Sequence, residues 1–343
     1  MSNATPVASK WTIVVAAALV GLLHVLSLAQ VGDQAYRGYR SDQSRVVREV
    51  SPGGPADRAG FRPGDRITRI AGVDAADSRA LDALPPARPG ERRAYVVDRG
   101  GRLVALSLTF GKLPLLDAFA YVTSGLTGMC FLVFGLWAYL WVPAASTRLL
   151  ALTGIGLGAT FVEMPYFASP GLRALQDAVL LPVAMFGFVF LLHFFLVFPV
   201  RKRVLAHGFT LPPPYVLATL VTVAYVPARL FGTEGWEVVG SLARAAALVL
   251  ALACFSLAVV AFVHGYLRTD RSLRSAWGLN GLLVALLLGF APMVPTAIAM
   301  VSPRFVLPAS EYYDLVWVLI PFALARAAVR QARARTAPCH APS

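Results

Sequence analysis

Four ionisable side chains of this 343-residue chain stand inside long apolar segments: His24, Glu163, His193 and His264. Ionisable groups inside a membrane usually mark a functional site, because placing them there costs free energy. A zinc protease would need His-Glu-x-x-His, which sets two imidazoles and a general base on one helix face, and a serine hydrolase would need Gly-x-Ser-x-Gly around its nucleophile. Neither pattern occurs in the sequence. We therefore predict a non-enzymatic protein that binds no metal and no cofactor.

The three histidines are predicted to lie at different depths in the membrane. His24 falls in the outer half of its apolar segment, whereas His193 and His264 fall near the inner ends of theirs. We expect them to pack or to form hydrogen bonds between helices rather than to converge on a shared site. Glu163 lies about one helical turn from the outer end of its segment. It either forms a polar functional site or reaches the membrane surface and pairs with Arg173 or Arg229.

Membrane helices must position these side chains, because 57% of the residues are hydrophobic and 14% are charged. A helix needs about 20 apolar residues to cross the hydrocarbon core. The sequence predicts about eight such helices, near residues 11–29, 115–142, 149–167, 175–199, 212–229, 240–265, 276–300 and 310–327. We interpret the first as an uncleaved anchor rather than a signal peptide, since Leu28-Ala29-Gln30-Val31 lacks a small-x-small cleavage pattern.

The short loops and tails show a strong bias of positive charge toward one side of these helices. One side carries twelve residues, namely Lys10, Arg148, Arg201, Lys202, Arg203, Arg268, Arg271, Arg274, Arg326, Arg330, Arg333 and Arg335. The other side carries four: Arg173, Arg229, Arg244 and Arg304. Lys and Arg concentrate on the cytoplasmic side, so both termini are predicted in the cytoplasm and segment 31–112 outside it. The formal charge of +13 thus indicates topology, and we expect no nucleic-acid partner.

Segment 31–112 is predicted to fold as a separate domain. Within it, Ser51–Pro55 breaks a strand, Ala56–Ala59 allows one helical turn, and Gly60 ends that turn with positive φ. Pro63–Asp65 forms a second turn before a strand at Arg66–Ile70. The flanks predict a strand at Arg45–Val50, a short helix at Ser78–Leu84, and a hairpin of Arg92–Val97 and Leu103–Phe110 around Asp98–Gly101.

This pattern resembles the heart of a bacterial PDZ domain. The matching residues are Ser51, Pro52, Pro55, Ala56, Ala59, Gly60, Pro63, Gly64, Asp65, Ile67, Ile70 and Gly72. The resemblance implies an α+β domain that binds extended peptides, often C-terminal ones, by adding a strand to a sheet edge while the backbone N–H groups of a Gly-containing loop hold the carboxylate.

The expected carboxylate-binding residues are Tyr36, Arg37, Gly38, Tyr39 and Arg40. Arg37 stands where the family usually has an apolar residue, so the segment is either a working peptide groove or a structural spacer. Arg37 and Arg40 either attract the carboxylate or are solvated surface residues. Gly38 is the sensitive position, and a side chain there is expected to weaken peptide binding while the domain stays folded.

A second resemblance concerns the whole arrangement. His193–Pro199 followed by Arg201–Arg203 looks like a helix end seen in the membrane sensor regions of bacterial histidine kinases. One anchor, an external PDZ-like domain and seven further helices resemble the input half of competence-pheromone-receptor-type kinases. With eight residues after Arg335, the chain is expected to lack a kinase domain and to require a separate cytoplasmic kinase or other output protein.

The predicted fold class is a mostly α polytopic membrane bundle with an α+β PDZ-like domain inserted between helices 1 and 2. The predicted parts are a cytoplasmic N-terminus and anchor (1–30), a periplasmic PDZ-like domain (31–112), a seven-helix bundle (113–328) and a basic cytoplasmic tail (329–343). The leading hypothesis is an inner-membrane signalling module that binds the lipid bilayer and an extracytoplasmic peptide or protein C-terminus. The alternatives are a scaffold for an envelope protease, secretion or transport complex, and a transporter or lipid-handling enzyme.

Overall fold

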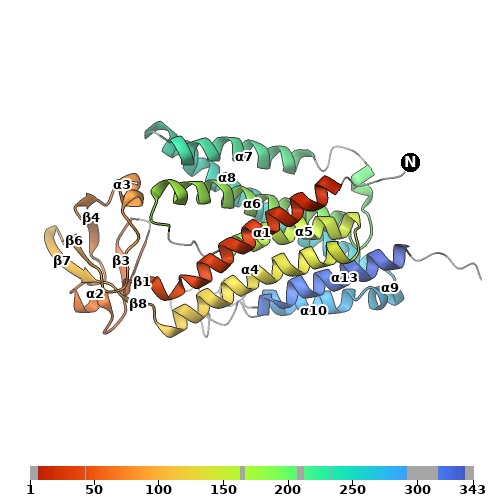
Figure 1. The fold of residues 1–343 in the computed structure, drawn as a ribbon, viewed down its shortest axis with the longest axis horizontal. Helices are drawn as coiled ribbons and strands as arrows, with labels where there is room; N and C mark the ends of the chain where they lie inside the picture. Colours follow the sequence, from red (N-terminus) through yellow and green to blue (C-terminus); the bar gives the residue numbers. More distant parts are fainter. Residues whose placement is uncertain are drawn as a thin grey trace, which may run out of the picture. The chain divides into compact units, whose positions relative to one another are not determined.

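The computed structural model describes residues 7–42, 44–162, 167–206, 212–232, 234–291 and 316–336. The chain forms two compact units (Figure 1). The helical unit comprises Met1–Val25, Thr123–Met164 and Ala174–Ser343, and the PDZ-like unit comprises Leu26–Val122 and Pro165–Arg173. Each unit has its own hydrophobic core, and each is described by itself.

The PDZ-like unit contains short strands in three small sheets. Its elements are η1 (Val31–Asp33), β1 (Ala35–Tyr36), β2 (Tyr39–Ser41), β3 (Val47–Val50), α2 (Pro55–Arg58), β4 (Arg66–Ile70), β5 (Val73–Asp74), α3 (Ser78–Ala83), β6 (Arg92–Arg99), β7 (Arg102–Thr109) and β8 (Gly111–Lys112). The sheets pair β1 with β8, β2 with β3, and four strands in the order β5-β4-β6-β7. Because β1 pairs with β8, the chain enters and leaves this unit at neighbouring positions.

Local sequence explains these elements. Pro55 occupies the first turn of α2, where its missing N–H costs nothing, and Gly60 ends the helix with φ of +85°. Gly100 and Gly101 both have positive φ, as a tight turn between β6 and β7 requires. The predicted helical turn, the strand at Arg66–Ile70 and the hairpin are therefore confirmed. Inward-facing residues close the core, including Val47, Phe61, Ile67, Val97 and Leu108.

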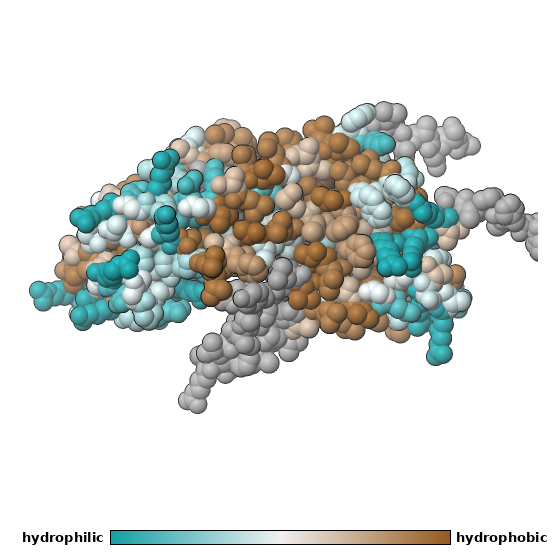
Figure 2. Space-filling view, turned by 60° about the horizontal axis from the view of Figure 1, so that its bottom comes forward, coloured by the Kyte–Doolittle hydropathy of each residue, from teal (hydrophilic) through white to brown (hydrophobic). Residues whose placement is uncertain are grey.

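The helical unit is built from helices whose apolar residues face both inward and outward. Its elements are α1 (Val7–Ala29), α4 (Leu115–Trp141), α5 (Ala145–Thr160), α6 (Pro170–Val197), η2 (Arg203–Ala206), α7 (Pro212–Phe231), α8 (Glu234–Arg268), α9 (Arg271–Ala276), α10 (Leu279–Phe290) and α13 (Leu319–Thr336). Helices α1, α4 and α6 continue from one unit into the other. Exposed leucine and valine side chains line α1, α7 and α8, as expected for helices that face lipid. Hydrophobic residues cover much of the visible helical surface in Figure 2.

Five helices in the described part of the chain are long and apolar enough to cross a membrane: Lys10–Ala29, Leu115–Trp141, Pro170–Val197, Pro212–Phe231 and Trp236–Arg268. The predicted total of about eight is not confirmed. The segment predicted at 149–167 forms the 16-residue helix α5, about 24 Å long, and α10 is shorter still at 12 residues. The final helix α13 runs to Thr336, past the boundary at 328, and carries several of the arginines predicted for the tail.

Glycines allow the central helix α5 to lie close to its neighbours. A Cβ on Gly156 of α5 would meet the Gly187 backbone nitrogen of α6 at 2.6 Å and the Val183 carbonyl oxygen at 2.8 Å. A Cβ on Gly158 would meet the Gly128 carbonyl oxygen of α4 at 3.0 Å. Small residues at helix crossings are typical of membrane bundles, where packing rather than the hydrophobic effect holds helices together. Helix α5 is accordingly buried along most of its length.

Candidate peptide-binding site

The loop predicted to hold a peptide carboxylate lies between β1 and β2. Gly38 is buried and has φ of +76°, a conformation that glycine adopts without strain. Its carbonyl oxygen accepts the Ser51 backbone N–H at 2.9 Å. A Cβ at Gly38 would meet Pro55 Cδ at 2.8 Å and the Pro55 nitrogen at 3.0 Å. Gly38 is therefore required for the loop to pack against the start of α2, and a side chain there would disturb the fold as well as any bound peptide.

Strand β2 has one covered edge and one open edge. β3 pairs with it on one side, and within the described residues no strand lies on the other. The Gly38 carbonyl oxygen points toward Ser51, the residue directly after β3. Because main-chain groups alternate in direction along a strand, the N–H and C=O groups of Tyr39 point toward the open edge. An extended peptide added at this edge would continue the sheet directly after the Gly38 loop, as strand addition requires.

An aromatic cluster fixes the beginning of β2. The Tyr39 ring stacks on Phe61 with centroids 5.2 Å apart, and Tyr95 meets both rings edge-on at 6.4 and 5.4 Å. Burial and the neighbouring Tyr39 hydroxyl raise the pKa of Tyr95 well above its ordinary value. Such ring contacts contribute about 0.5–1.5 kcal/mol each beyond area burial. The cluster thus holds Tyr39 with its side chain in the core and its backbone at the strand edge.

The two arginines next to the loop are solvent-exposed. Arg40 forms a long ion pair of 3.8 Å with Glu49 across β2 and β3, and both side chains are largely exposed. Exposed pairs of this kind contribute about 1 kcal/mol or less. Arg40 is therefore able to exchange Glu49 for the carboxylate of a ligand at small cost.

Helix α3 is the element expected to form the second wall of the groove. Asp77 caps it by accepting the Ala80 backbone N–H at 2.8 Å. The helix has six residues, Ser78–Ala83, and so ends one residue before the predicted end at Leu84. Arg173 in the first turn of α6 donates to the carbonyl oxygens of Asp82 at 2.5 Å and Leu84 at 3.1 Å. Arg173 also donates to Phe167. It therefore ties the end of α3 to segment 167–173 of the same unit.

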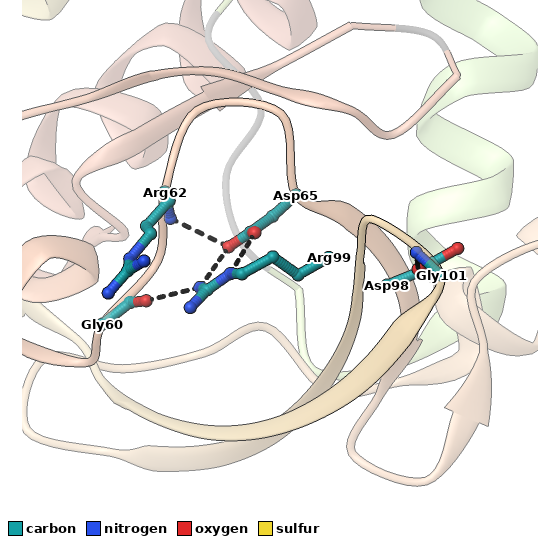
Figure 3. A network of polar contacts seen from close by, with 6 residues as sticks. All are labelled: Gly60, Arg62, Asp65, Asp98, Arg99 and Gly101. Atoms are coloured by element: carbon teal, nitrogen blue, oxygen red, sulfur yellow. Dashed lines mark hydrogen bonds and ion pairs between the residues drawn. The ribbon is translucent and has the colours of Figure 1, made fainter.

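An ion pair between the buried Asp65 and the partly buried Arg99 connects several turns of the PDZ-like unit (Figure 3). The Asp65 side chain is 1% exposed and accepts Nε and Nη2 of Arg99 at 2.7 and 2.8 Å. It also accepts the Arg62 backbone N–H at 2.8 Å. Arg99 Nη2 reaches the Gly60 carbonyl oxygen at 2.7 Å. The pair thereby joins the end of β6 to the turns on both sides of Arg62.

We expect Arg99→Gln to lower the free energy of unfolding of the PDZ-like unit by about 3 kcal/mol, because it leaves a buried carboxylate unpaired. The check is the urea midpoint at which hydrogen-exchange protection of β4 and β6 is lost in the full-length protein. Arg102→Gln, at the exposed first position of β7, is the control and should leave the midpoint nearly unchanged. Equal midpoints for the Arg99 variant and the wild type would contradict the assigned role.

The same pair predicts a pH dependence. Burial alone would raise the pKa of Asp65, but hydrogen bonds from Arg99 and Arg62 and the Arg99 charge hold it below its ordinary value. A carboxylate with a lowered folded-state pKa stabilises the fold above its unfolded pKa of about 3.9 and loses that contribution as pH falls through the folded value. Wild-type stability should therefore fall below about pH 4 more steeply than that of Arg99→Gln.

The three histidines predicted inside the membrane lie in separate surroundings. His24 is buried, and its Nε2 lies 3.1 Å from the Gly158 carbonyl oxygen of α5. His193 Nδ1 lies 2.9 Å from the Tyr215 hydroxyl of α7. His264 is exposed on α8. No cluster of three His, Cys, Asp or Glu side chains with metal-binding geometry is present among the described residues.

Glu163 lies outside the described residues, so its role stays a prediction. The arginines proposed as its partners have other contacts. Arg229 binds Asp177 through Nη2 at 2.5 Å and Nε at 3.0 Å, and Arg173 holds backbone carbonyls of the PDZ-like unit. Sequence reasoning missed both arrangements, and it also missed Arg99, because each joins residues far apart in the chain without a local pattern.

Comparison with known proteins agrees with the geometry of this unit. The PDZ domain family matches residues 46–83, so the chain contains a PDZ domain. Two proteins named "Putative zinc metalloprotease", from Brucella suis biovar 1 (strain 1330) and Brucella melitensis biotype 1 (strain ATCC 23456), are each 33% identical to this chain over 61 residues. The matched part covers 18% of this chain and 16% of the length of each relative.

Proposed function

We propose that this protein is a non-enzymatic membrane receptor whose PDZ domain binds an extended peptide or protein C-terminus outside the cytoplasm. The observation that carries the proposal is the open edge of β2, which begins directly after the Gly38 loop. Loop donors would hold the terminal carboxylate, and the β2 backbone would pair with the residues before it. A separate cytoplasmic kinase or other output protein would receive the signal.

Arg173 supports a signalling role, because it connects the groove to a membrane helix. It donates to the last carbonyls of α3, the proposed groove wall, from the first turn of α6. Helix α6 then continues to Val197. A peptide that displaces α3 would change these contacts and so bias the position of α6. Binding can shift such an equilibrium by as much as its affinity differs between the two arrangements.

The proposed topology places both termini in the cytoplasm and the PDZ domain in the periplasm of a bacterial inner membrane. In the helical unit, α13 and α6 end together, because Arg335 and Gln331 of α13 donate to the Pro199 carbonyl oxygen just after α6. Helix α1 begins at this same end (Figure 1). Arg201–Arg203 and the last turns of α13 bring many basic residues there, which supports a cytoplasmic orientation of this end.

A second candidate function is an accessory or scaffold subunit for an envelope protease. The resemblance of the PDZ segment to proteins named as zinc metalloproteases favours it, whereas the sequence lacks His-Glu-x-x-His. In this alternative the same β2 edge would hold a protease or its substrate. The two candidates share the binding site and differ in the partner, so identification of the bound polypeptide separates them.

The binding proposal predicts a preference for a free C-terminal carboxylate. Full-length protein in detergent would be mixed with fluorescent peptide pools that have four random C-terminal residues and end in either a carboxylate or an amide. We expect the carboxylate pool to contain ligands that bind at least about tenfold more tightly than their amidated forms, since a charge-assisted hydrogen bond contributes about 1.5–3 kcal/mol. Binding by neither pool, or equal binding by both forms, would contradict carboxylate capture.

A further inference from the structure

The helical unit contains a cavity of about 670 Å³ that is separate from the PDZ-like unit. It lies between the end of α6, the turn that follows, the start of α7 and the last part of α8. Its lining residues are Leu192, Leu196, Val200, Arg201, Lys202, Arg203, Pro214, Leu257, Val260, Ala261, His264 and Arg268. Four basic residues and one histidine thus share a wall with seven apolar residues, and the described residues of the lining include no acid.

The cations of this cavity lack protein partners within the described part of the chain. No hydrogen bond or ion pair joins the side chains of Arg201, Lys202, Arg203 or Arg268 to another described residue. Arg274, at the same end of the unit, is engaged: it lies 4.6 Å from the Tyr266 ring and donates to the Thr269 carbonyl oxygen. Four uncompensated charges thus line this one cavity, where an anion would reduce their mutual repulsion.

A general preference of Lys and Arg for the cytoplasmic side explains their presence here but not their position over an apolar hollow. Leu192 and Ala261 form a buried part of the wall, while Leu257 and Val260 are 56% and 64% exposed. The apolar side of the cavity is thus open to the surroundings of the helices. From Leu257 to Arg268, α8 extends about 16 Å. This length allows much of an acyl chain to lie against α8 while its charged headgroup lies near Arg268.

The turn that carries the basic residues is held in place before any ligand binds. The Lys202 ammonium rests against α8 at Gly265, where a Cβ would also meet Pro199 Cδ at 3.0 Å. The Pro199 carbonyl oxygen accepts Gln331 Nε2 at 2.8 Å and Arg335 Nη2 at 3.1 Å. A prearranged site lowers the ordering cost of binding.

We propose that this cavity binds an anionic phospholipid, with its phosphate at Arg201, Lys202, Arg203 and Arg268 and an acyl chain along Leu257 and Val260. Basic pockets between membrane helices suit anionic headgroups, and guanidinium groups match phosphate oxygens in geometry and charge. A free phosphate would use the basic rim but would have no use for the apolar wall. The site is independent of the PDZ groove.

Native mass spectrometry of the full-length protein, in detergent doped with dioleoylphosphatidylglycerol or dioleoylphosphatidylcholine, tests this proposal. We expect a bound phosphatidylglycerol and at least tenfold weaker retention of phosphatidylcholine. R201Q/R203Q should weaken phosphatidylglycerol binding at least tenfold, because it removes two exposed rim cations without changing the core. The matched control R271Q/R326Q removes two exposed arginines outside the cavity and should retain the lipid.

A second variant tests the apolar half of the site. Val260→Trp enlarges an exposed side chain of the wall and should weaken phosphatidylglycerol binding without any change in charge. Equal retention of the two lipids, equal losses in the two double arginine variants, or full displacement of phosphatidylglycerol by millimolar inorganic phosphate would each overturn the proposal. The last result would assign the cavity to a free phosphate instead of a lipid.

Discussion

Gly38→Val is expected to destabilise the PDZ-like unit strongly, which is a larger effect than the loss of a ligand contact. Valine would have to adopt φ of +76°, at a cost of roughly 1–2 kcal/mol. Its Cβ would also meet Pro55 Cδ at 2.8 Å and the Pro55 nitrogen at 3.0 Å, and such overpacking typically costs about 1–3 kcal/mol. Together these effects remove about 2–5 kcal/mol from a domain whose total stability is of the order of 5–15 kcal/mol.

Gly53→Val is the matched control, because Gly53 has φ of +68° and nothing lies within 4 Å of its Cβ position. It carries the backbone strain without the collision. Hydrogen exchange of the full-length protein in detergent should show a much larger drop in protection across β3 and β4 in the Gly38 variant than in the Gly53 variant. Native protection in the Gly38 variant would show that the loop does not depend on contact with α2.

Gly156→Val is expected to have a comparable effect on the helical unit. A Cβ at this position would meet the Gly187 nitrogen at 2.6 Å and the Val183 carbonyl oxygen at 2.8 Å, and both belong to the backbone of α6, which cannot move aside as a side chain can. We expect destabilisation of about 3 kcal/mol and a melting temperature lower by about 10 °C. The measurement is thermal unfolding of the purified protein in detergent.

Gly281→Val provides the comparison for this substitution. Gly281 lies in α10, is exposed, and has nothing within 4 Å of its Cβ position, so the same change in helix propensity occurs without a collision. Its melting temperature should stay within about 2 °C of the wild type, which corresponds to roughly 0.5 kcal/mol. Similar losses in the two variants would mean that α5 and α6 do not depend on close backbone contact.

Much of the PDZ-like unit could be predicted from its sequence because its elements are defined locally. Pro55 starts a helix, Gly60 ends it, and Gly100 and Gly101 specify a tight turn wherever they occur between two strands. The contacts that position the site are different in kind. Arg99 meets Asp65 across 34 residues, and Arg173 meets Leu84 across 89. No periodicity or motif in the sequence indicates such pairs, because their members become neighbours only in the folded domain.

The membrane helices, too, could be predicted only in part from the sequence. Apolar composition identifies α1, α4, α6, α7 and α8, because a helix that crosses lipid must be apolar along its length. It does not identify the role of α5, whose three closely spaced glycines let it lie between its neighbours, or the extent of α13. The prediction that a side chain at Gly38 would affect only peptide binding also missed a contact between distant residues. The sequence shows a glycine next to a strand, whereas the structure shows that α2 occupies the space of its missing side chain.

The central claim is that a polypeptide binds along the open edge of β2, and site-specific photocrosslinking in living cells tests it most directly. A benzophenone amino acid would replace Ser41, which is exposed on β2, or Arg69, which is exposed on β4 between two paired strands. We expect position 41 to capture a discrete polypeptide and position 69 to capture none. Equal capture at both positions, or none at position 41, would contradict peptide binding at this edge.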